Sequence, residues 1–430
     1  MGLRSIANPC ESGTMPLWVL LLALWPAERL RAQPESRAEE IEAARDGKQQ
    51  KLSPEAPDKW ERRLLYMKEA RLVERFTFGY YGFRASIGQM ATGSGFAFGP
   101  EYFRQDLAGG TLAFRASAAA STRRWVKLNT TFGAPRLFRN HAEWYVQTEH
   151  HNYNSIDYYG SGPDSKEESR TNYRLEDTAI DTRFMVRPWR WLGIGASGGY
   201  LLMNIGPGQG ETPSTDQIFS PTVTPGLDQQ TDFWRYGPLA SINYLDSPAG
   251  PRSGGLYTLR YDIYRDRKLR LFSFERLEVD LQQYIPLFNK RRVIALRGKA
   301  ATTTKGAGQQ VPFYFQNVLG GANDLRGFAQ YRFYGDQMVL LNAEWRWEAF
   351  PALDVAFFGD AGKVSERSGD IIRFKGFETT LGFGFRFNVR NATFMRLDFG
   401  FSREGFRFWF KFNDIYGKLP LGQSSPLHVY

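Results

Sequence analysis

A strict alternation of apolar and polar side chains is the feature that most restricts how this chain can fold. In the stretch GFRFWFKFND, residues 405–414, phenylalanine occupies every second position, with arginine, tryptophan and lysine in between. Successive side chains of a β-strand point to opposite faces, so this period of two predicts a strand with one apolar and one polar face. The apolar face carries Phe406, Phe408, Phe410 and Phe412, and the other carries Arg407, Trp409 and Lys411.

The same alternation recurs between turn residues from position 93 to position 413, for example in residues 337–350, 377–388 and 393–402. The core of a soluble sandwich does not tolerate charges, whereas the water-filled interior of a membrane barrel does, with the apolar faces against lipid. At roughly 20 residues for each strand and its connection, residues 93–413 accommodate about sixteen strands. We therefore predict an all-β protein, a transmembrane antiparallel β-barrel of about sixteen strands. Charged residues on the polar faces of the three stretches include Glu344, Arg346, Glu348, Arg386, Arg396 and Asp398.

The N-terminal residues indicate export. One apolar run, MPLWVLLLALWPA at residues 15–27, follows Arg4 and precedes the small residue Ala32. It is shorter than the roughly 20 residues of a spanning helix. Residues 1–32 are therefore predicted to be a secretory signal peptide that is cleaved after Ala32. Two alternatives stay open, namely a start of translation at Met15 and a membrane anchor in place of the signal.

Three further segments flank the predicted barrel. Residues 33–57 are polar, lack apolar periodicity and are predicted to be a disordered periplasmic leader. Residues 58–92 are predicted to hold a short amphipathic helix and the entry to the barrel, because Asp58 and Glu61 have the spacing of a helix-starting capping box. This helix is expected at the periplasmic rim or, alternatively, as a plug or a docking element. Residues 414–430 are predicted to be a C-terminal tail.

Residues that could carry chemistry are scarce. The single cysteine, Cys10, precedes the apolar run, so the mature chain has no thiol, and we predict no metal site and no cofactor. The stretch GIGASGG, residues 193–199, fits the glycine patterns of nucleotide-binding and nucleophile turns, but no helix signal follows, so it is predicted to be a strand. His150 and His151 are adjacent and would face opposite sides of a strand. His151 is the candidate base of an alternative function, an outer-membrane lipid hydrolase.

A loop between two predicted strands resembles a known family. The stretch NVLGGANDLRGFAQYRF, residues 317–333, carries an LRGF motif formed by Leu325, Arg326, Gly327 and Phe328. It is similar to the sixth extracellular loop of the BamA/TamA-like superfamily, also called bacterial surface antigens. The resemblance implies that the loop folds back into the barrel and that its arginine binds carboxylates there. Family members commonly have valine or a similar aliphatic residue where this chain has leucine.

A second motif accompanies the loop. The stretch FGDAGKV, residues 358–364, resembles the F-x-D-x-G motif of the same family, with Phe358, Asp360 and Gly362 at its fixed positions. The resemblance implies that Asp360 pairs with the loop arginine and that Glu344, on the intervening strand, takes part. Counting by twos also puts both carboxylates on the charged faces of their strands, where they can hold a planar guanidinium.

Two more stretches agree with the resemblance, and two features depart from it. Residues 155–168 resemble the Y-G-x-G loop of the family, and residues 246–257 resemble its D-x-P…G-G hairpin. Typical members carry periplasmic POTRA domains, for which residues 33–75 offer too little chain, so the sequence resembles the branch without POTRA domains. The tail after the last strand is the second departure.

The resemblance implies a protein of the bacterial outer membrane that is not an enzyme. The expected role is the assembly of outer-membrane proteins or lipids, or the export of a separately encoded polypeptide. Expected partners are client proteins, outer-membrane lipids and lipopolysaccharide, because a net charge of +10 in an exported chain suits anionic lipid better than nucleic acid. The alternatives are a substrate-conducting porin, which would lack the inward-folded arginine loop, and the lipid hydrolase.

Overall fold

The computed structural model separates the chain into two units, residues 1–70 and residues 71–430. In the first unit the described residues, 45–47, are helical. The expected signal peptide, the rest of the leader, the helix expected after residue 58 and the C-terminal tail lie outside the described residues. The structure describes residues 45–47, 81–87, 90, 93–247, 250–288, 290–350, 352–371, 373, 375–389 and 392–412.

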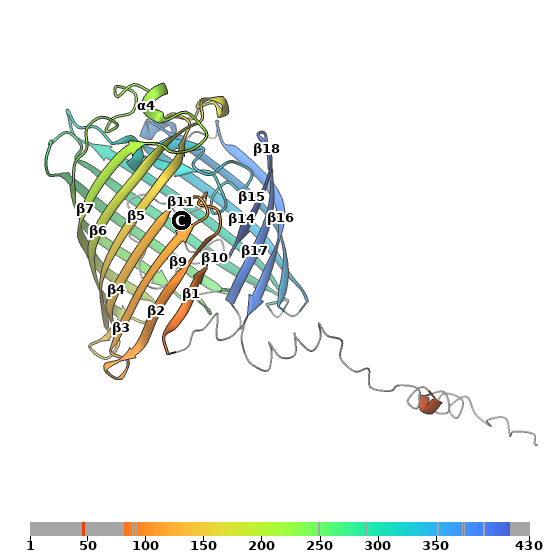
Figure 1. Ribbon diagram of the computed structural model, residues 1–430. Helices are drawn as coiled ribbons and strands as arrows, with labels where there is room; N and C mark the ends of the chain where they lie inside the picture. The colour runs from red at the N-terminus through yellow and green to blue at the C-terminus, as the bar shows by residue number, and fades with distance from the viewer. Residues whose placement is uncertain are drawn as a thin grey trace, which may run out of the picture. The chain divides into compact units, whose positions relative to one another are not determined.

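Sixteen strands of the second unit form one antiparallel sheet that curls into a barrel (Figure 1). Each strand pairs with the next along the sheet, in the order β1 to β11 and then β14 to β18. The predicted all-β class and the count of about sixteen strands are confirmed. The strands are β1 (Phe83–Ile87), β2 (Ala97–Leu107), β3 (Leu112–Ser121), β4 (Val126–Leu137), β5 (Ala142–Tyr158), β6 (Thr171–Trp189), β7 (Leu192–Pro207), β8 (Phe233–Asn243), β9 (Gly254–Asp266), β10 (Phe274–Leu287), β11 (Arg292–Lys305), β14 (Gln337–Phe350), β15 (Leu353–Ser365), β16 (Glu378–Val389), β17 (Ala392–Ser402) and β18 (Gly405–Lys411).

The connections between strands differ in length at the two ends of the barrel. At one end, here called the turn end, most strands are joined by short turns. At the other, the loop end, most connections are longer. The loop between β7 and β8 carries the short helix α4 (Thr215–Ile218), seen at the top of Figure 1. The β11–β14 loop, residues 306–336, contains a two-stranded sheet of β12 (Asn317–Leu319) and β13 (Phe333–Gly335).

In the described part of the barrel unit, helical structure is limited to α4 and to 3-10 turns. Among the described residues, no helix is both long enough and apolar enough to cross a membrane. Strand β1 begins at Phe83, inside the segment 58–92 that was expected to hold the barrel entry. The 3-10 turns are η1 (Ala108–Gly110), η2 (Glu167–Ser169), η3 (Phe313–Phe315) and η4 (Ser368–Asp370).

The alternation read from the sequence separates an apolar outer surface from a charged inner surface. On β14, Leu341, Trp345 and Trp347 are exposed on the outside, whereas Glu344 and Arg346 are buried on the inside. A continuous outer surface of large apolar side chains is the surface that a transmembrane barrel presents to lipid. The same surface continues over β15 to β18 with Phe357, Leu381, Phe383, Phe401, Phe406, Phe408 and Phe410.

The glycine-rich stretch 193–199 lies within β7, as predicted, and its glycines make room for a charged pair inside the barrel. A Cβ atom on Gly199 would lie 2.1 Å from Asp181 Oδ1. Arg235 of β8 holds this carboxylate, and its Nε donates to Oδ1 at 2.6 Å. Both charged side chains are buried, so the glycine permits a compensated ion pair where a larger residue would displace it.

Aromatic side chains fill the interior at the loop end. Phe313, Tyr314 and Phe315 of the β11–β14 loop are completely buried against inward-facing rings of the wall. The ring centroid of Phe313 lies 4.8 Å from that of Tyr173 on β6, and the centroid of Phe315 lies 5.0 Å from that of Phe233 on β8. The expectation of a water-filled interior is therefore wrong at this end, because the loop brings an apolar core of its own. This aromatic plug also includes Trp125, Tyr153, Tyr158, Tyr264, Phe274, Tyr331 and Tyr334.

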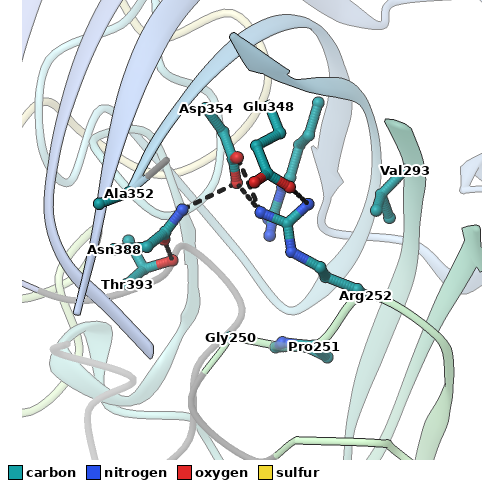
Figure 2. Close-up of a pocket in the computed structure, with 10 residues that line it drawn as sticks. Gly250, Pro251, Arg252, Val293, Glu348, Ala352, Asp354, Asn388 and Thr393 are labelled. Atoms are coloured by element: carbon teal, nitrogen blue, oxygen red, sulfur yellow. Dashed lines mark hydrogen bonds and ion pairs between the residues drawn. The ribbon is translucent and has the colours of Figure 1, made fainter. Parts of the chain in front are cut away.

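The β8–β9 turn, which resembles the D-x-P…G-G hairpin, closes part of the turn end. Asp246 accepts hydrogen bonds from the backbone N–H groups of Arg252 and Ser253 at 3.0 and 3.1 Å and from Lys290 Nζ at 2.9 Å. Burial raises the pKa of the Asp246 carboxyl, but these hydrogen bonds outweigh burial and lower the pKa to about 2. Arg252 then reaches across to Asp354 of β15, at 2.8 and 3.0 Å, beside a cavity of about 180 Å³ (Figure 2).

Candidate functional site

The β11–β14 loop folds back into the barrel, and its tip, residues 325–328, lies against the inner face of β14 to β18. The stem of the loop is fixed by Asn317, whose Nδ2 donates to the backbone oxygen of Asp336 at 2.8 Å and to Thr303 Oγ1 at 3.1 Å. All four tip residues are buried. The structure thus places the whole LRGF motif inside the barrel rather than in the solvent above it.

Arg326 contacts both carboxylates that the sequence singled out. Its Nε and Nη2 donate to Oδ2 and Oδ1 of Asp360 at 2.9 and 2.7 Å, and Nη1 donates to Glu344 Oε2 at 2.7 Å. The backbone N–H of Arg326 adds a bond to Asp360 Oδ2 at 3.1 Å. The guanidinium also lies over the Phe358 ring, 3.3 Å from its centroid. The three charged side chains are fully buried, and the planar fork of the arginine is matched directly by the two carboxylates.

Two residues to which the sequence assigned no role, Arg386 of β16 and Asp398 of β17, extend this site. Arg386 donates from Nη2 and Nε to Glu344 at 2.9 and 3.1 Å, and its Nη1 lies 2.7 Å from Asp398 Oδ1. Asp398 also accepts from Arg396 at 2.6 Å, and Glu344 accepts from Arg346 at 2.8 Å. Glu344 is therefore shared by three arginines. We call the connected set Arg326, Arg346, Arg386, Arg396, Glu344, Asp360 and Asp398 the Arg326 cluster.

The backbone of the tip is bound by the last three strands. The N–H of Gly327 donates to Thr380 Oγ1 of β16 at 3.1 Å, and the carbonyl oxygen of Gly327 accepts from Ser402 Oγ of β17 at 2.8 Å. The carbonyl oxygen of Arg326 accepts from Trp409 Nε1 of β18 at 2.7 Å. Trp409 stands in the opening alternation, but only the folded chain shows that it binds the loop. The tip thus joins β14 to β18 into one bonded unit.

The apolar residues of the motif pack beside the charged ones. Leu325 and Phe328 belong to a buried apolar cluster within the barrel, where the ring of Phe328 lies 5.2 Å from that of Phe333. Gly362 of β15 leaves the space for this packing, since a Cβ atom there would lie 3.0 Å from Leu319 Cδ1 and 3.2 Å from Leu325 Cδ2. The glycine of the F-x-D-x-G stretch is therefore explained by close approach of the loop.

The loop also contacts its neighbours at the loop end. Arg332 Nε donates to Glu404 Oε1 in the β17–β18 turn at 2.9 Å, and its Nη2 donates to the backbone oxygen of Ser165 at 2.7 Å. Its guanidinium lies over the ring of Tyr159, 4.9 Å from the centroid. Burial raises the pKa of the Glu404 carboxyl, and the neighbouring Arg332 opposes this rise. The stretch that resembles the Y-G-x-G loop therefore packs on the folded β11–β14 loop.

We expect Gly400→Ala on β17 to dislodge the tip. A Cβ atom at Gly400 would lie 2.4 Å from the carbonyl oxygen and 2.6 Å from the carbonyl carbon of Arg326. Because both are backbone atoms, relief requires the tip to move, at a cost on the order of 1–3 kcal/mol. Chymotrypsin cleavage in the loop of the folded protein measures the displacement. The control is Gly359→Ala on β15, whose nearest neighbour is Leu381 Cδ2 at 3.5 Å. Equal protection of the loop in Gly400→Ala and in the parent would contradict this prediction.

His150 and His151 lie on β5 and have partners outside the Arg326 cluster. His151 Nδ1 lies 3.1 Å from Asp177 Oδ1 on the inner face, whereas His150, on the outer face, lies 2.9 Å from Thr178 Oγ1. Within the described residues no serine hydroxyl is hydrogen-bonded to His151. No set of three or more His, Cys, Asp or Glu residues in the described part of the chain has the geometry of a metal site.

Comparison with known families identifies the protein class. The family model of the Omp85 superfamily domain matches residues 79–410, from just before β1 into β18. The chain belongs to the Omp85 superfamily. The resemblance stated from the LRGF loop is thereby confirmed, and the protein is a β-barrel of the bacterial outer membrane. Short turns of such barrels face the periplasm and long loops face outward, so the loop end of this Omp85 protein is its extracellular end. No curated protein matches the sequence.

Solved structures of the superfamily share the fold. BamA from Haemophilus ducreyi lacking POTRA domains 1-3 is 16% identical, with a TM-score of 0.58 over 77% of this chain and 70% of that chain. CdiB from Escherichia coli is 12% identical, with a TM-score of 0.50 over 75% of this chain and 58% of that chain. The chain thus spans less than two thirds of that CdiB chain. At these identities the likeness concerns the fold alone.

Proposed function

We propose that this Omp85 barrel is not an enzyme and acts in the assembly of outer-membrane proteins or lipids, or in the export of a separately encoded polypeptide. The observation that carries the proposal is the attachment of the loop tip to five consecutive strands, β14 to β18, through Arg326 and its neighbours. Membership of the superfamily supports it. Client proteins and the lipids around the barrel are the partners that this role requires.

The energetics of the Arg326 cluster support a role beyond holding the barrel together. A buried ion pair gains little net stability, because removing two charges from water offsets most of their attraction. Neighbouring strands of the sheet are already joined by ladder hydrogen bonds, so their pairing does not depend on the cluster. The cluster does make the position of the loop depend on the spacing and curvature of β14 to β18. Any client that bends or separates these strands would therefore act on the loop, and the loop would act on the strands.

The two alternatives receive less support. A porin needs a continuous aqueous path, whereas the aromatic plug around Phe313 and Phe315 is packed inside the barrel at its extracellular end. A lipid hydrolase needs a nucleophile beside the His151–Asp177 pair, and the described residues place no serine there. Ion conductance of the purified protein in planar bilayers distinguishes the porin, and lipid hydrolysis by the purified protein distinguishes the enzyme.

The proposal is tested in a deletion strain by proteomic and lipid profiling of the outer membrane and by analysis of exported polypeptides. We expect the deletion to change the abundance of particular outer-membrane proteins, lipids or an exported polypeptide. The parent chain and His151→Gln should restore the profile, whereas Arg326→Ala should restore it only in part although the barrel is present. Restoration by Arg326→Ala and failure of His151→Gln would favour the hydrolase. An unchanged profile in the deletion strain would refute the proposal.

A further inference from the structure

The loop between β9 and β10 presents an unusual surface at the extracellular end. Its residues 267–271 read RKLRL, and all five side chains are exposed. Two of them are leucines, of which Leu269 is 37% and Leu271 43% exposed. We call residues 267–271 the basic loop. Large apolar side chains between cations are costly in water, but they suit the boundary between lipid headgroups and acyl chains.

The basic loop is held in one conformation from beneath. The carboxylate of Asp266 accepts hydrogen bonds from four backbone N–H groups, those of Lys268 and Leu269 at 3.0 Å each, Leu271 at 2.9 Å and Phe272 at 3.1 Å. The side chain of Phe272 is buried in the aromatic plug. Asp266 binds the backbone N–H groups of the basic loop and so fixes the loop conformation. Binding of a ligand to the exposed side chains therefore costs little further backbone entropy.

Some cations of this region form ion pairs with carboxylates, and others do not. Arg265 pairs with Glu275 at 3.2 Å, and Lys268 pairs with Asp232 at 2.7 Å. Arg267 instead donates to the hydroxyl of Tyr200 at 3.0 Å. Arg270, which has a left-handed backbone with φ of 59°, makes no side-chain hydrogen bond or ion pair with the described part of the chain. Within those residues neither Arg267 nor Arg270 has a carboxylate partner, so both guanidinium groups are open to an external anion.

The level of the loop relative to the membrane follows from the rings below it. On the outer face, Tyr200 of β7 and Trp234 of β8 lie with centroids 4.8 Å apart, and Trp234 is half exposed. Arg267 lies over the Tyr200 ring, 5.5 Å from the centroid. Aromatic girdles of this kind mark the interface of a transmembrane barrel. The basic loop therefore stands at the headgroup level of the outer leaflet.

We propose that the basic loop is a binding site for the phosphate groups of the glycolipid that forms the outer leaflet, lipid A of lipopolysaccharide. Arg267 and Arg270 bind phosphate, which a guanidinium matches with two parallel hydrogen bonds, while Leu269 and Leu271 contact acyl chains. The site rests on the outer-membrane location and on the loop geometry, and it is independent of the proposed role in assembly or export.

The test is the binding of purified diphosphorylated lipid A to the full chain in detergent, compared with lipid A stripped of its phosphates and with inorganic phosphate. Each cation beside an anionic lipid surface contributes roughly 5-fold in affinity, so Arg267→Gln with Arg270→Gln should weaken binding by about 25-fold. The matched control is Arg139→Gln with Arg190→Gln, which removes two exposed arginines from the turn end. High salt should weaken binding to the parent chain, since these charges are exposed.

Several outcomes would overturn the site. Equal loss in the control variant would mean that net charge alone attracts the lipid. If dephosphorylated lipid A bound as tightly as diphosphorylated lipid A, or if salt did not weaken binding to the parent chain, the phosphate groups would not be the bound groups. Complete competition by inorganic phosphate at low concentration would assign the loop to free phosphate instead of lipid. Heat-modifiable migration of each variant on gels confirms that it is folded before binding is compared.

Discussion

Replacing Arg326 with alanine is expected to release the loop tip from the wall and to leave the sixteen-stranded sheet in place. The change removes the guanidinium that binds Asp360 and Glu344 and leaves both carboxylates buried. Loss of one partner from a buried charge pair costs about 3–5 kcal/mol. The strands keep their ladder hydrogen bonds, so the loss falls on the loop. Chymotrypsin, which can cleave after Phe328 and Tyr331 once the loop is exposed, measures this release on the folded protein.

Other variants at this site should release the loop tip to different degrees. Arg326→Lys should restore protection only in part, because an ammonium group cannot form the planar fork. Asp360→Asn should be milder than Arg326→Ala, since Glu344 still binds the guanidinium. The control is Arg265→Ala, because Arg265 is 49% exposed and pairs with Glu275 at the surface, where such pairs contribute little. Full protection in Arg326→Ala, or equal sensitivity in Arg265→Ala, would contradict the proposed clamp.

A charge on the outer phenylalanine face is expected to destabilise the barrel strongly. Phe410 of β18 is 44% exposed on the outer surface and follows Gly405, the first residue of the strand, by five positions. At a rise of about 3.3 Å per residue and a tilt of about 40°, it lies roughly 13 Å below the extracellular turn, near the middle of the apolar band. Phe410→Arg should therefore lower the free energy of unfolding by about 2–4 kcal/mol. Reversible unfolding in lipid vesicles with denaturant measures the change.

Two controls show whether the loss of stability depends on the depth of the new charge in the membrane and on the face of the strand that carries it. Phe406→Arg lies beside the turn, near the headgroups, and should cost only about 0–1 kcal/mol. Lys411→Arg lies on the inner face of the same strand and should cost little. If Phe410→Arg and Phe406→Arg had equal effects, the membrane position assigned to β18 would be wrong.

The sequence by itself determined the class of fold, because each face of a membrane strand must match its medium. The phenylalanines at every second position from Phe406 to Phe410 leave one apolar face, and the charged side chains on the other faces exclude a dry core. Sixteen strands followed from the length of the repeating region. The motif order also indicated which side chains belong together, since Arg326, Glu344 and Asp360 meet in the folded chain.

The partners of the remaining charges were decided only by the tertiary structure. The alternation predicted that Arg386 and Asp398 lie on inner faces. It did not predict which inward-facing side chains of different strands come into contact, because that depends on the register and curvature of the sheet. Their contact depends on the register that sets Gly384 opposite Asp398. A Cβ atom on Gly384 would lie 2.6 Å from Asp398 Oδ1 and 2.8 Å from Arg386 Nη1, so the glycine leaves the space in which the two groups meet.

The aromatic plug could not be predicted from the sequence, for a related reason. Phe313, Tyr314 and Phe315 stand together in a loop and have no periodicity that assigns them to an inner or outer face. Their burial requires the concave wall that β5 to β10 form far away along the chain, and it exists only once the loop has folded inward. The periodic strands therefore predicted the barrel, whereas the filling of its interior was decided by the inward folding of a long loop against the curved sheet.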